Sequence, residues 1–222
     1  MTTSTTQLNL YNDALLICGE RSLASLTEER EPRRLLDQAW GNNGSAIQFC
    51  LEQAPWNFAI RTQLIDNDPD ASPTFGLNYR FNKPADWVST AAVCQDEFFK
   101  VPLLNYFDEV DYWYAPLTPI YVRFVSNATD YGLAMARWPQ TFADYVSAHL
   151  AGKIILKLTT DQARRDYILH PKDGLEARRL LTAKNKNALS TPTLFPAKGN
   201  WVKARQTRGN QDLGNTQQLI GG

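Results

Sequence analysis

The first hydrophobic stripe in the chain has the period of a helix. In the segment QLNLYNDALLICG, the side chains of Leu8, Tyr11, Leu15 and Cys18 recur every three or four positions, which places them on one helical face. Gly19 follows, and glycine commonly ends a helix because it adopts the left-handed conformation at no steric cost. The pattern therefore predicts a helix that packs one face into a core and ends at Gly19.

A second helical stripe runs from about Thr27 to Ala54. The Thr27 hydroxyl can cap the start of this helix, Pro32 is compatible only with its first turn, and Pro55 ends it. The segment 41–44, Gly-Asn-Asn-Gly, either interrupts the helix or is carried within it, and the pattern leaves both alternatives open.

Helical periodicity returns in the last third of the chain. One stripe starts at Pro139 and continues to Leu158, and a further helix opens at Asp161. The segment 170–174, HPKDG, either breaks or kinks this last helix around Pro171. These helices are expected to pack against the first two as a bundle.

Between Trp56 and Thr129 the pattern changes to that of strands. Short aromatic and β-branched runs alternate with prolines and acidic residues, which is typical of strands joined by turns. In PIYVRFV, the residues Ile120, Val122 and Phe124 form an apolar face and the opposite face is mixed, as in a half-exposed antiparallel strand. The other runs of this kind are YRFNKPADWVSTAAV, FFKVPLL and DYWYA.

Together these patterns predict a mainly helical α+β fold. We expect an antiparallel bundle of about four helices from residues 1–55 and 136–189, with a small antiparallel β-sheet inserted at 56–135. Residues 190–222 are expected to form an extended C-terminal arm, because their apolar residues are isolated among five glycines and two prolines. A chain of 222 residues can bury about 70% of its unfolded surface without disulfides or metals.

The sequence contains no candidate membrane span or export signal. No apolar run approaches the roughly 18 residues of a transmembrane helix. The first segment, MTTSTTQLNLYND, has neither the basic region nor the apolar region of a signal peptide. We therefore expect a protein that stays in the cytoplasm where it is made and has no membrane partner.

The charges divide unevenly along the chain, although 23 basic and 23 acidic residues cancel overall. Residues 1–150 hold 10 Lys and Arg against 18 Asp and Glu, and residues 151–222 hold 13 against 5. This asymmetry indicates either two ends that face different partners or subunits that meet head to side with opposite potentials. A few solvated helix faces would give the same numbers.

Candidate metal and catalytic residues are few. Cys18, Cys50 and Cys94 are widely spaced and do not combine with His149 and His170 into a zinc-site pattern, so we predict no metal and no cofactor. His149 is expected to be a satisfied core or interface residue, and His170 a cap or surface residue. The sequence motifs of nucleotide-binding loops, serine hydrolases and zinc proteases are all missing, which disfavours an enzyme.

Clustered carboxylates are the remaining candidates for acid–base or metal chemistry. They are Asp96, Glu97, Asp108, Glu109 and Asp111. They lie between aromatic runs, without a histidine or a glycine-rich phosphate loop beside them. We interpret them as solvated turns.

The expected C-terminal arm carries basic and apolar residues that suit partner binding. With Trp201 between Lys198 and Lys203, it could follow phosphates and stack a base. A protein partner fits equally well, since isolated apolar anchors in a segment rich in glycine and proline are typical of tails that fold on binding. The candidate binding residues are Leu194, Phe195, Trp201, Val202, Lys203, Arg205 and Arg208.

Three motifs follow one another in a recognisable order. The chain opens with NLYNDALLICGERSLASLTEE, continues at residues 55–59 with PWNFA, and then has YRF at 79–81 followed by PAD at 84–86. In this order they resemble the tail tubular protein A family, the head-to-tail adaptors of short-tailed bacteriophages. The matching positions of the first motif are Leu15, Ile17, Gly19, Glu20, Ser22 and Leu26, with Cys18 as a departure. The likeness in element order covers roughly residues 8–187.

The resemblance implies a structural virion protein located in the tail or neck. Such a protein forms a ring, typically of twelve copies, that joins the portal to the tail nozzle and lets double-stranded DNA pass without sequence-specific contact. The arm would anchor the ring to the portal, the strand region would face the next tail component, and the acidic first part would line the channel and repel phosphates.

The resemblance also gives a role to the segment where the second helix meets the strands. Pro55 ends the helix, and Trp56 and Phe58 bury large areas where the bundle meets the sheet. This corner, with Pro84 and Asp86, would fix the angle between helices and strands, because a ring closes only if every copy repeats the same rotation.

Two other functions remain open at the level of sequence. One is a neck or head-completion protein of a longer-tailed phage. The other is a sequence-nonspecific DNA-binding module, which would bind bare DNA with an affinity that falls steeply with salt. A peptidoglycan hydrolase is disfavoured because the sequence offers no nucleophile or acid–base pair.

Overall fold

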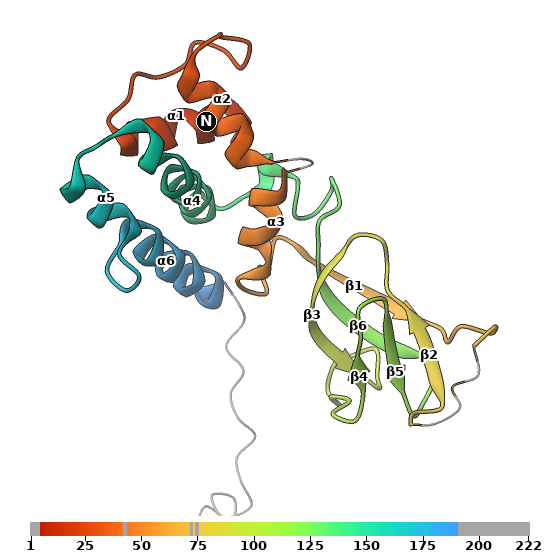
Figure 1. Cartoon of the computed structure of the whole chain (residues 1–222). Coiled ribbons are helices and arrows are strands. Elements are labelled where there is room, and N and C mark those ends of the chain that lie inside the picture. Colours follow the sequence, from red (N-terminus) through yellow and green to blue (C-terminus); the bar gives the residue numbers. More distant parts are fainter. Residues whose placement is uncertain (1–4, 42–43, 72, 74–75, 191–222) are drawn as a thin grey trace, which may run out of the picture. The chain divides into compact units, whose positions relative to one another are not determined.

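The computed structural model describes residues 5–41, 44–71, 73 and 76–190, which belong to one compact unit. Within these residues the fold is α+β, with six α-helices and two three-stranded antiparallel sheets (Figure 1). The helices are α1 Gln7–Cys18, α2 Glu31–Trp40, α3 Ser45–Glu52, α4 Gln140–Leu158, α5 Gln162–Leu169 and α6 Leu175–Leu189. The strands are β1 Ile60–Ile65, β2 Tyr79–Asn82, β3 Trp87–Cys94, β4 Phe107–Asp108, β5 Tyr112–Ala115 and β6 Ile120–Ser126.

Helix α1 is capped by a side chain at its start and ends at Gly19, the end that its sequence predicts. The Thr6 hydroxyl accepts a hydrogen bond from the Asn9 amide at 3.3 Å, which satisfies one of the free N–H groups of the first turn. Gly19 adopts φ 78°, and its N–H points back to the carbonyls of Leu15 and Leu16. The helix ends where a side chain would be strained, as predicted.

The second helical stripe is divided into α2 and α3. Gly41 and Gly44 adopt φ 74° and 73°, a backbone conformation that no α-helix continues through. The last helical stripe is divided in the same way, since α5 ends at Leu169 and α6 begins at Leu175, on either side of Pro171. These two breaks give the described part of the chain six helices where about four were expected.

The expected Thr27 cap is wrong. Helix α2 begins at Glu31, its N-cap residue is Arg30, and no side-chain hydrogen bond caps it. Pro32 does lie in its first turn. The segment before α2 is held instead as a turn by the Glu28 carboxylate, which accepts the Ala24 amide at 2.8 Å. The Thr27 hydroxyl itself is bonded to the Ser25 hydroxyl at 2.9 Å, and α2 begins one turn later than expected.

The strand region forms two sheets where one was expected. Their strand orders are β1-β6-β3 and β2-β5-β4, with antiparallel neighbours throughout. The run FFKVPLL is not a strand; it makes a single bridge between Pro102 and Cys94. Proline lacks the N–H that a sheet ladder requires, and Phe99 has φ 54°, which reverses the chain direction there.

The helices bury a common core around α4. This helix packs against α1, α2 and α6 (Figure 1), and it is buried along most of its circumference. The strands form a second core to which both sheets contribute. Its buried members are Phe81, Val93, Leu103, Trp113, Ala115, Ile120, Val122 and Phe124. Val88 of β3 and Val125 of β6 belong to the helical core, so one end of the first sheet is embedded among the helices.

No helix in the described part of the chain is long and apolar enough to cross a bilayer.

Candidate functional site

The corner between α3 and β1 is built around the buried ring of Trp56. This side chain is 1% exposed, and its Nε1 donates to the Cys50 carbonyl at 3.0 Å, which lies in the last turn of α3. The Trp56 carbonyl in turn accepts the Ala59 amide at 2.9 Å. Pro55 is exposed and stands just after the helix end. The Gln53 amide also donates to this carbonyl, at 3.4 Å, so the indole adds a second and shorter hydrogen bond there and fixes the direction in which the chain leaves α3.

Phe142, in the first turn of α4, is the centre of an aromatic cluster at the corner. Its ring centroid lies 4.9 Å from Trp56, 4.8 Å from Phe58 and 4.9 Å from Trp138. The Trp56 and Trp138 contacts are edge-to-face, and each aromatic pair of this kind contributes about 0.5–1.5 kcal/mol beyond its buried area. Trp138 Nε1 also donates to the Gly132 carbonyl at 2.9 Å. The cluster connects the corner to the start of α4.

Asn187 connects the corner to the end of α6. Its side-chain amide donates to the Pro55 carbonyl at 3.0 Å, and its side-chain oxygen accepts the Asn57 backbone N–H at 2.8 Å. The Asn57 side chain donates to the Asn187 carbonyl at 3.0 Å. Three hydrogen bonds therefore join segments 130 positions apart. Sequence reasoning missed this contact, because an asparagine on a polar helix face carries no periodic signal.

Asp86 holds the strands together at the other side of the corner. Its carboxylate accepts from one Arg61 nitrogen at 2.9 and 3.0 Å and from the Ser126 hydroxyl, while its carbonyl accepts the Asn127 amide. The Pro84 carbonyl accepts the Trp87 amide at 3.0 Å and shapes the turn into β3. Partial burial acts to raise the pKa of Asp86, but the hydrogen bonds from Ser126 and Arg61 outweigh it and leave this pKa below its ordinary value.

A second polar network lies on the strands and was not predicted. The Lys83 ammonium is 3.6 Å from the centroid of the Trp87 ring and 2.5 Å from the Asp108 carboxylate, and its side chain is 4% exposed. The Thr90 hydroxyl accepts from the indoles of Trp87 at 3.2 Å and Trp113 at 3.0 Å and donates to Asp108 at 2.6 Å. Each buried indole N–H thus has a partner, which a low-dielectric interior requires.

The clustered carboxylates that the sequence singled out have structural partners or face solvent. Asp96 accepts the backbone N–H groups of Lys100 and Val101, which lowers its pKa. Asp108 belongs to the Lys83 network, and Glu109 is exposed. Within residues 5–190, as far as they are described, no three His, Cys, Asp or Glu side chains are grouped closely enough to hold a metal ion.

His149 lies in the helical core and bridges α4 to α6. Its Nδ1 is 2.9 Å from the Glu176 carboxylate, and its ring stacks on Phe49 with 4.6 Å between centroids. His170 lies after α5, and its Nδ1 accepts the Asp173 amide at 3.0 Å. Both histidines therefore take part in helix contacts or turns.

The three thiols are buried and unreactive. Burial raises the pKa of Cys18 to about 11 and that of Cys50 to about 12, and it also raises the pKa of Cys94. A thiol is a nucleophile only as the thiolate, so none of the three is activated.

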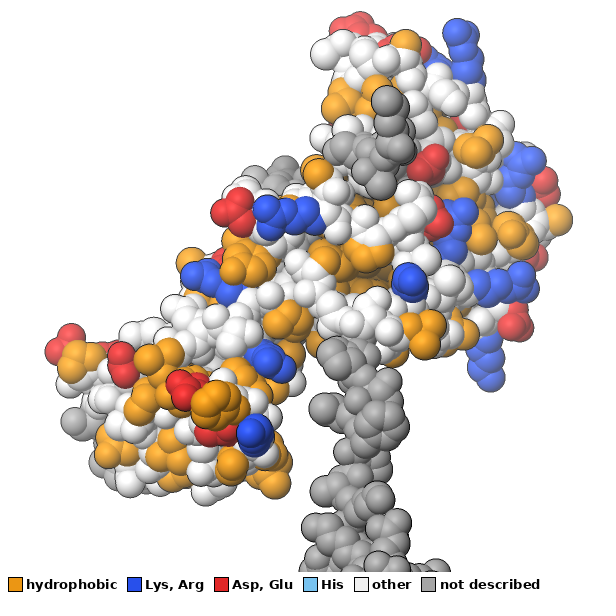
Figure 2. All heavy atoms as spheres, turned by 180° about the vertical axis from the view of Figure 1, so that it is seen from behind, with side chains coloured by type: hydrophobic (Ala, Val, Ile, Leu, Met, Phe, Trp, Pro, Cys, Tyr) orange, Lys and Arg blue, Asp and Glu red, His pale blue; other side chains and the backbone are white. Residues whose placement is uncertain are grey.

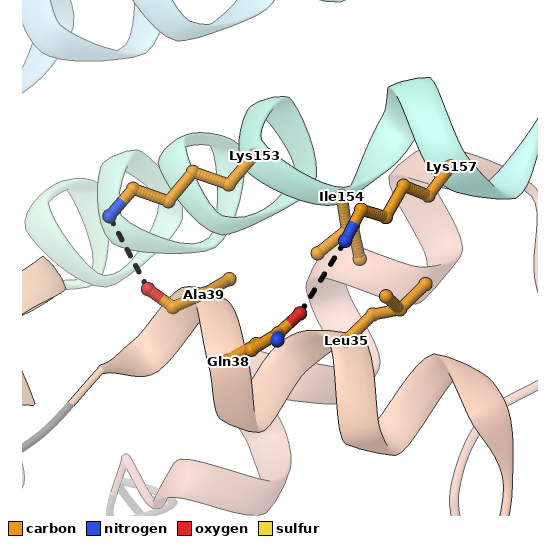
Figure 3. Close-up of a pocket in the computed structure, with 6 residues that line it drawn as sticks. All are labelled: Leu35, Gln38, Ala39, Lys153, Ile154 and Lys157. Atoms are coloured by element: carbon orange, nitrogen blue, oxygen red, sulfur yellow. Dashed lines mark hydrogen bonds between the residues drawn. The ribbon is translucent and has the colours of Figure 1, made fainter.

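Two grooves lie on the helical part. One, of about 210 Å³, borders the corner at Trp56, Phe58 and Phe142 and reaches Asn187 and Ser190. The other, of about 300 Å³, lies between α2 and α4 (Figure 3). We call it the lysine groove; its lining residues are Leu35, Gln38, Ala39, Lys153, Ile154 and Lys157. Figure 3 shows both lysines reaching from α4 towards α2, where Lys153 donates to the Ala39 carbonyl at 3.3 Å.

The strand part and the last helices differ in charge. Residues 56–135 contain ten Asp and Glu against five Lys and Arg, whereas residues 151–190 contain four against nine. On the face drawn in Figure 2, both parts carry side chains of both charges, and the strand part also exposes apolar side chains next to acidic ones. The excess of basic residues therefore belongs to the segment from the second half of α4 to α6, because residues 1–55 of the helical part hold seven Asp and Glu against four Lys and Arg.

The candidate arm residues, from Leu194 to Arg208, lie outside the described residues. Comparisons with protein-family models and with curated proteins find no match for this chain.

Proposed function

We propose that this protein is a structural virion component, the head-to-tail adaptor that joins a portal to a tail nozzle. In this proposal, copies of the chain form a ring through which double-stranded DNA leaves the capsid. The order of the three motifs around PWNFA supports the proposal, because each resembles the adaptor family at its own place in the chain.

The observation that carries the proposal is the tightly bonded corner. Trp56, Phe58 and Phe142 pack ring against ring, and Asn187 ties the same segment to α6. A ring with heterologous contacts closes only when each subunit repeats one rotation, so the joint between its two binding surfaces has to be stiff. A joint connected to α3, α4 and α6 at once meets that requirement.

The proposal assigns a part to each region of the chain. The helices serve as the bundle that forms the body of the adaptor, and the strand region faces the next tail component. Residues 190–222 serve as the extended arm that anchors the ring to the portal. The basic residues of this arm, Lys203, Arg205 and Arg208, would meet acidic portal surfaces.

Binding to the portal encoded in the same genome tests the proposal. The full-length chain and a version ending at Leu189 are mixed with the portal, and complexes are imaged by electron microscopy. Full-length rings on the portal that are lost on truncation would support both the adaptor role and the arm as anchor. Portal binding by the truncated version would still support the adaptor role, but it would show that the helices, and not the arm, anchor the ring.

Two further results separate this function from its alternatives. No portal binding, together with salt-sensitive binding to bare DNA, would favour a DNA-binding module and overturn the proposal. If portal binding occurs, neutralising Lys203, Arg205 and Arg208 should weaken it and flatten its salt dependence. If this substitution leaves the affinity for the portal unchanged, the basic residues are not part of the anchor.

A further inference from the structure

The tight turn between β4 and β5 exposes an apolar side chain between two acids. Val110 is 83% exposed, and Glu109 and Asp111 on either side of it are also exposed. Leu104, in the preceding loop, is 86% exposed. A single exposed apolar side chain is common on a protein surface, but this one stands between two exposed carboxylates, which gives the turn an apolar centre with negative charge on both sides. We call residues 108–111 the hairpin tip.

The hairpin tip is held in one conformation by the strand network. The Glu109 amide donates to the Tyr112 carbonyl at 2.9 Å, and the Lys83 amide donates to the Asp111 carbonyl at 2.9 Å. The Lys83 ammonium bonds to both Asp108 and the Glu109 carbonyl. A rigid tip of this kind loses little conformational entropy when it docks, which favours binding.

The lysine groove has the complementary character. Its lining is mixed: Leu35 and Ala39 of α2 and Ile154 of α4 supply the apolar part, and Lys153 and Lys157 stand along its α4 side (Figure 3). Each ammonium has three donors, so the bonds from Lys153 to the Ala39 carbonyl and from Lys157 to Gln38 leave donors for a carboxylate. About 300 Å³ is the lower limit for ligand pockets and suits one or two side chains.

We propose that the lysine groove receives the hairpin tip of a second copy of this chain. Val110 would contact Leu35 and the edges of Ala39 and Ile154, and Glu109 and Asp111 would pair with Lys153 and Lys157. A single copy does not satisfy this contact, because both the tip and the two lysines are exposed in the same structure. The contact is heterologous, so it repeats from copy to copy. This inference rests on the proposed function, because it names the contact between neighbouring copies in the proposed ring.

Crosslinking between two single-cysteine variants tests the contact. Val110→Cys and Gln38→Cys are made in separate full-length chains, one with a size tag, mixed, and treated with a short bismaleimide. A link between the two positions then joins different chains. The native thiols are buried, so the unsubstituted chain is the blank. Replacing Val110→Cys by Leu16→Cys, at an exposed site on α1, gives the matched control. Peptide mass spectrometry identifies the linked positions.

A charge exchange provides a second, independent measurement. Lys153→Glu with Lys157→Glu should weaken self-association by roughly tenfold or more, because like charges facing each other across an interface are strongly unfavourable. For crosslinking, the groove variant also carries Gln38→Cys, and a tip variant with Glu109→Lys and Asp111→Lys also carries Val110→Cys. Mixing these two variants should restore the link between positions 110 and 38. Lys172→Glu with Lys184→Glu, which reverses the same number of charges elsewhere, should leave self-association unchanged.

The outcomes for the contact and for the adaptor role can be told apart. Rings on the portal without a 110–38 link would overturn the contact and keep the adaptor role. A 110–38 link restored by charge exchange, without portal binding, would keep the contact and overturn the adaptor role. A link of equal yield with Leu16→Cys would show random collision and overturn the contact.

Discussion

Asn187, three residues before the end of the described chain, donates its side-chain amide to the carbonyl of Pro55 at 3.0 Å. Two more hydrogen bonds join it to Asn57. The last helix is thereby fixed to the segment in which the first half of the helical part turns into strands. Two of the three bonds use the Asn187 side chain, so their contribution can be measured by a single substitution.

Replacing Asn187 by alanine should destabilise the folded unit by about 1–2 kcal/mol, because hydrogen bonds of this partly exposed kind each contribute about 0.5–1.5 kcal/mol. Urea unfolding followed by tryptophan fluorescence measures the change. Asn185→Ala is the matched control, since Asn185 is exposed on the same helix and gains the same helix propensity. Equal stabilities of the two variants would contradict a clamp at Asn187.

Replacing Trp56 by alanine should cost about 3–5 kcal/mol, because it removes a fully buried ring from the centre of the corner. Trp56→Phe keeps an aromatic ring but loses the donor to the Cys50 carbonyl, and should cost about 1–3 kcal/mol. The free energy of unfolding in urea, followed by circular dichroism, measures both. Similar values for the two variants would mean that the ring contacts with Phe142 contribute little.

Replacing Thr90 by valine should destabilise the strand core by about 2–4 kcal/mol. The valine has nearly the same shape but cannot accept, so the Trp87 and Trp113 indoles both lose a partner, and Trp113 is fully buried. Thr90→Ser retains the hydroxyl and serves as the control, with a cost of about 1 kcal/mol for the lost methyl group. Thermal unfolding of the native chain and the two variants measures these differences. A serine variant as unstable as the valine variant would contradict the role of the Thr90 hydroxyl as acceptor for the two indoles.

Asp86 gives the folded unit a defined dependence on pH. Its pKa in the folded state lies below the ordinary value of 3.8, so its carboxylate stabilises the fold above that value and loses this effect as the pH falls through the folded pKa. Asp86→Asn should therefore be less stable than the native chain at neutral pH, and the difference should shrink below about pH 4. Urea midpoints measured across this range test the expectation, and a difference that does not vary with pH would contradict it.

The end of α1 and the start of α5 could be predicted because helical periodicity and end signals agree there. Gly19 ends α1, and the Asp161 carboxylate accepts the Arg164 amide at the start of α5. The breaks at Gly41 and Pro171 were left open by the sequence. Glycine and proline both weaken a helix without ending it in every case, and tertiary packing decides the outcome.

The division of the strands into two sheets could not be predicted in the same way. Alternation along β6 indicates which residues face a core, but it does not show which strand lies beside which. The Lys83 network illustrates the difficulty, because it joins residues from a turn, β3, β4 and β5. Such a network depends on strand pairing, which the order of residues alone does not contain.

The candidate site shows the same contrast. Trp56 and Phe58 stand out in the sequence because large aromatic residues two positions apart follow a proline. Phe142 and Asn187, which hold them in place, stand in helices that give no sign of their partners. Sequence motifs thus pointed to one side of the corner, and the long-range packing that supplies the other side became visible only in the structure.

The position of Asn187 also decides how the folded unit would carry tension. Ser190 follows α6 directly, so a pull on the chain beyond it enters the last turn of that helix. Three hydrogen bonds join Asn187 to Pro55 and Asn57. The load would therefore pass from α6 to the junction of α3 and β1 and be divided among these three bonds. A helix end without such bonds would instead open one backbone hydrogen bond at a time. A chain pulled from its C-terminal side would therefore resist at the corner where the rings of Trp56, Phe58 and Phe142 pack together.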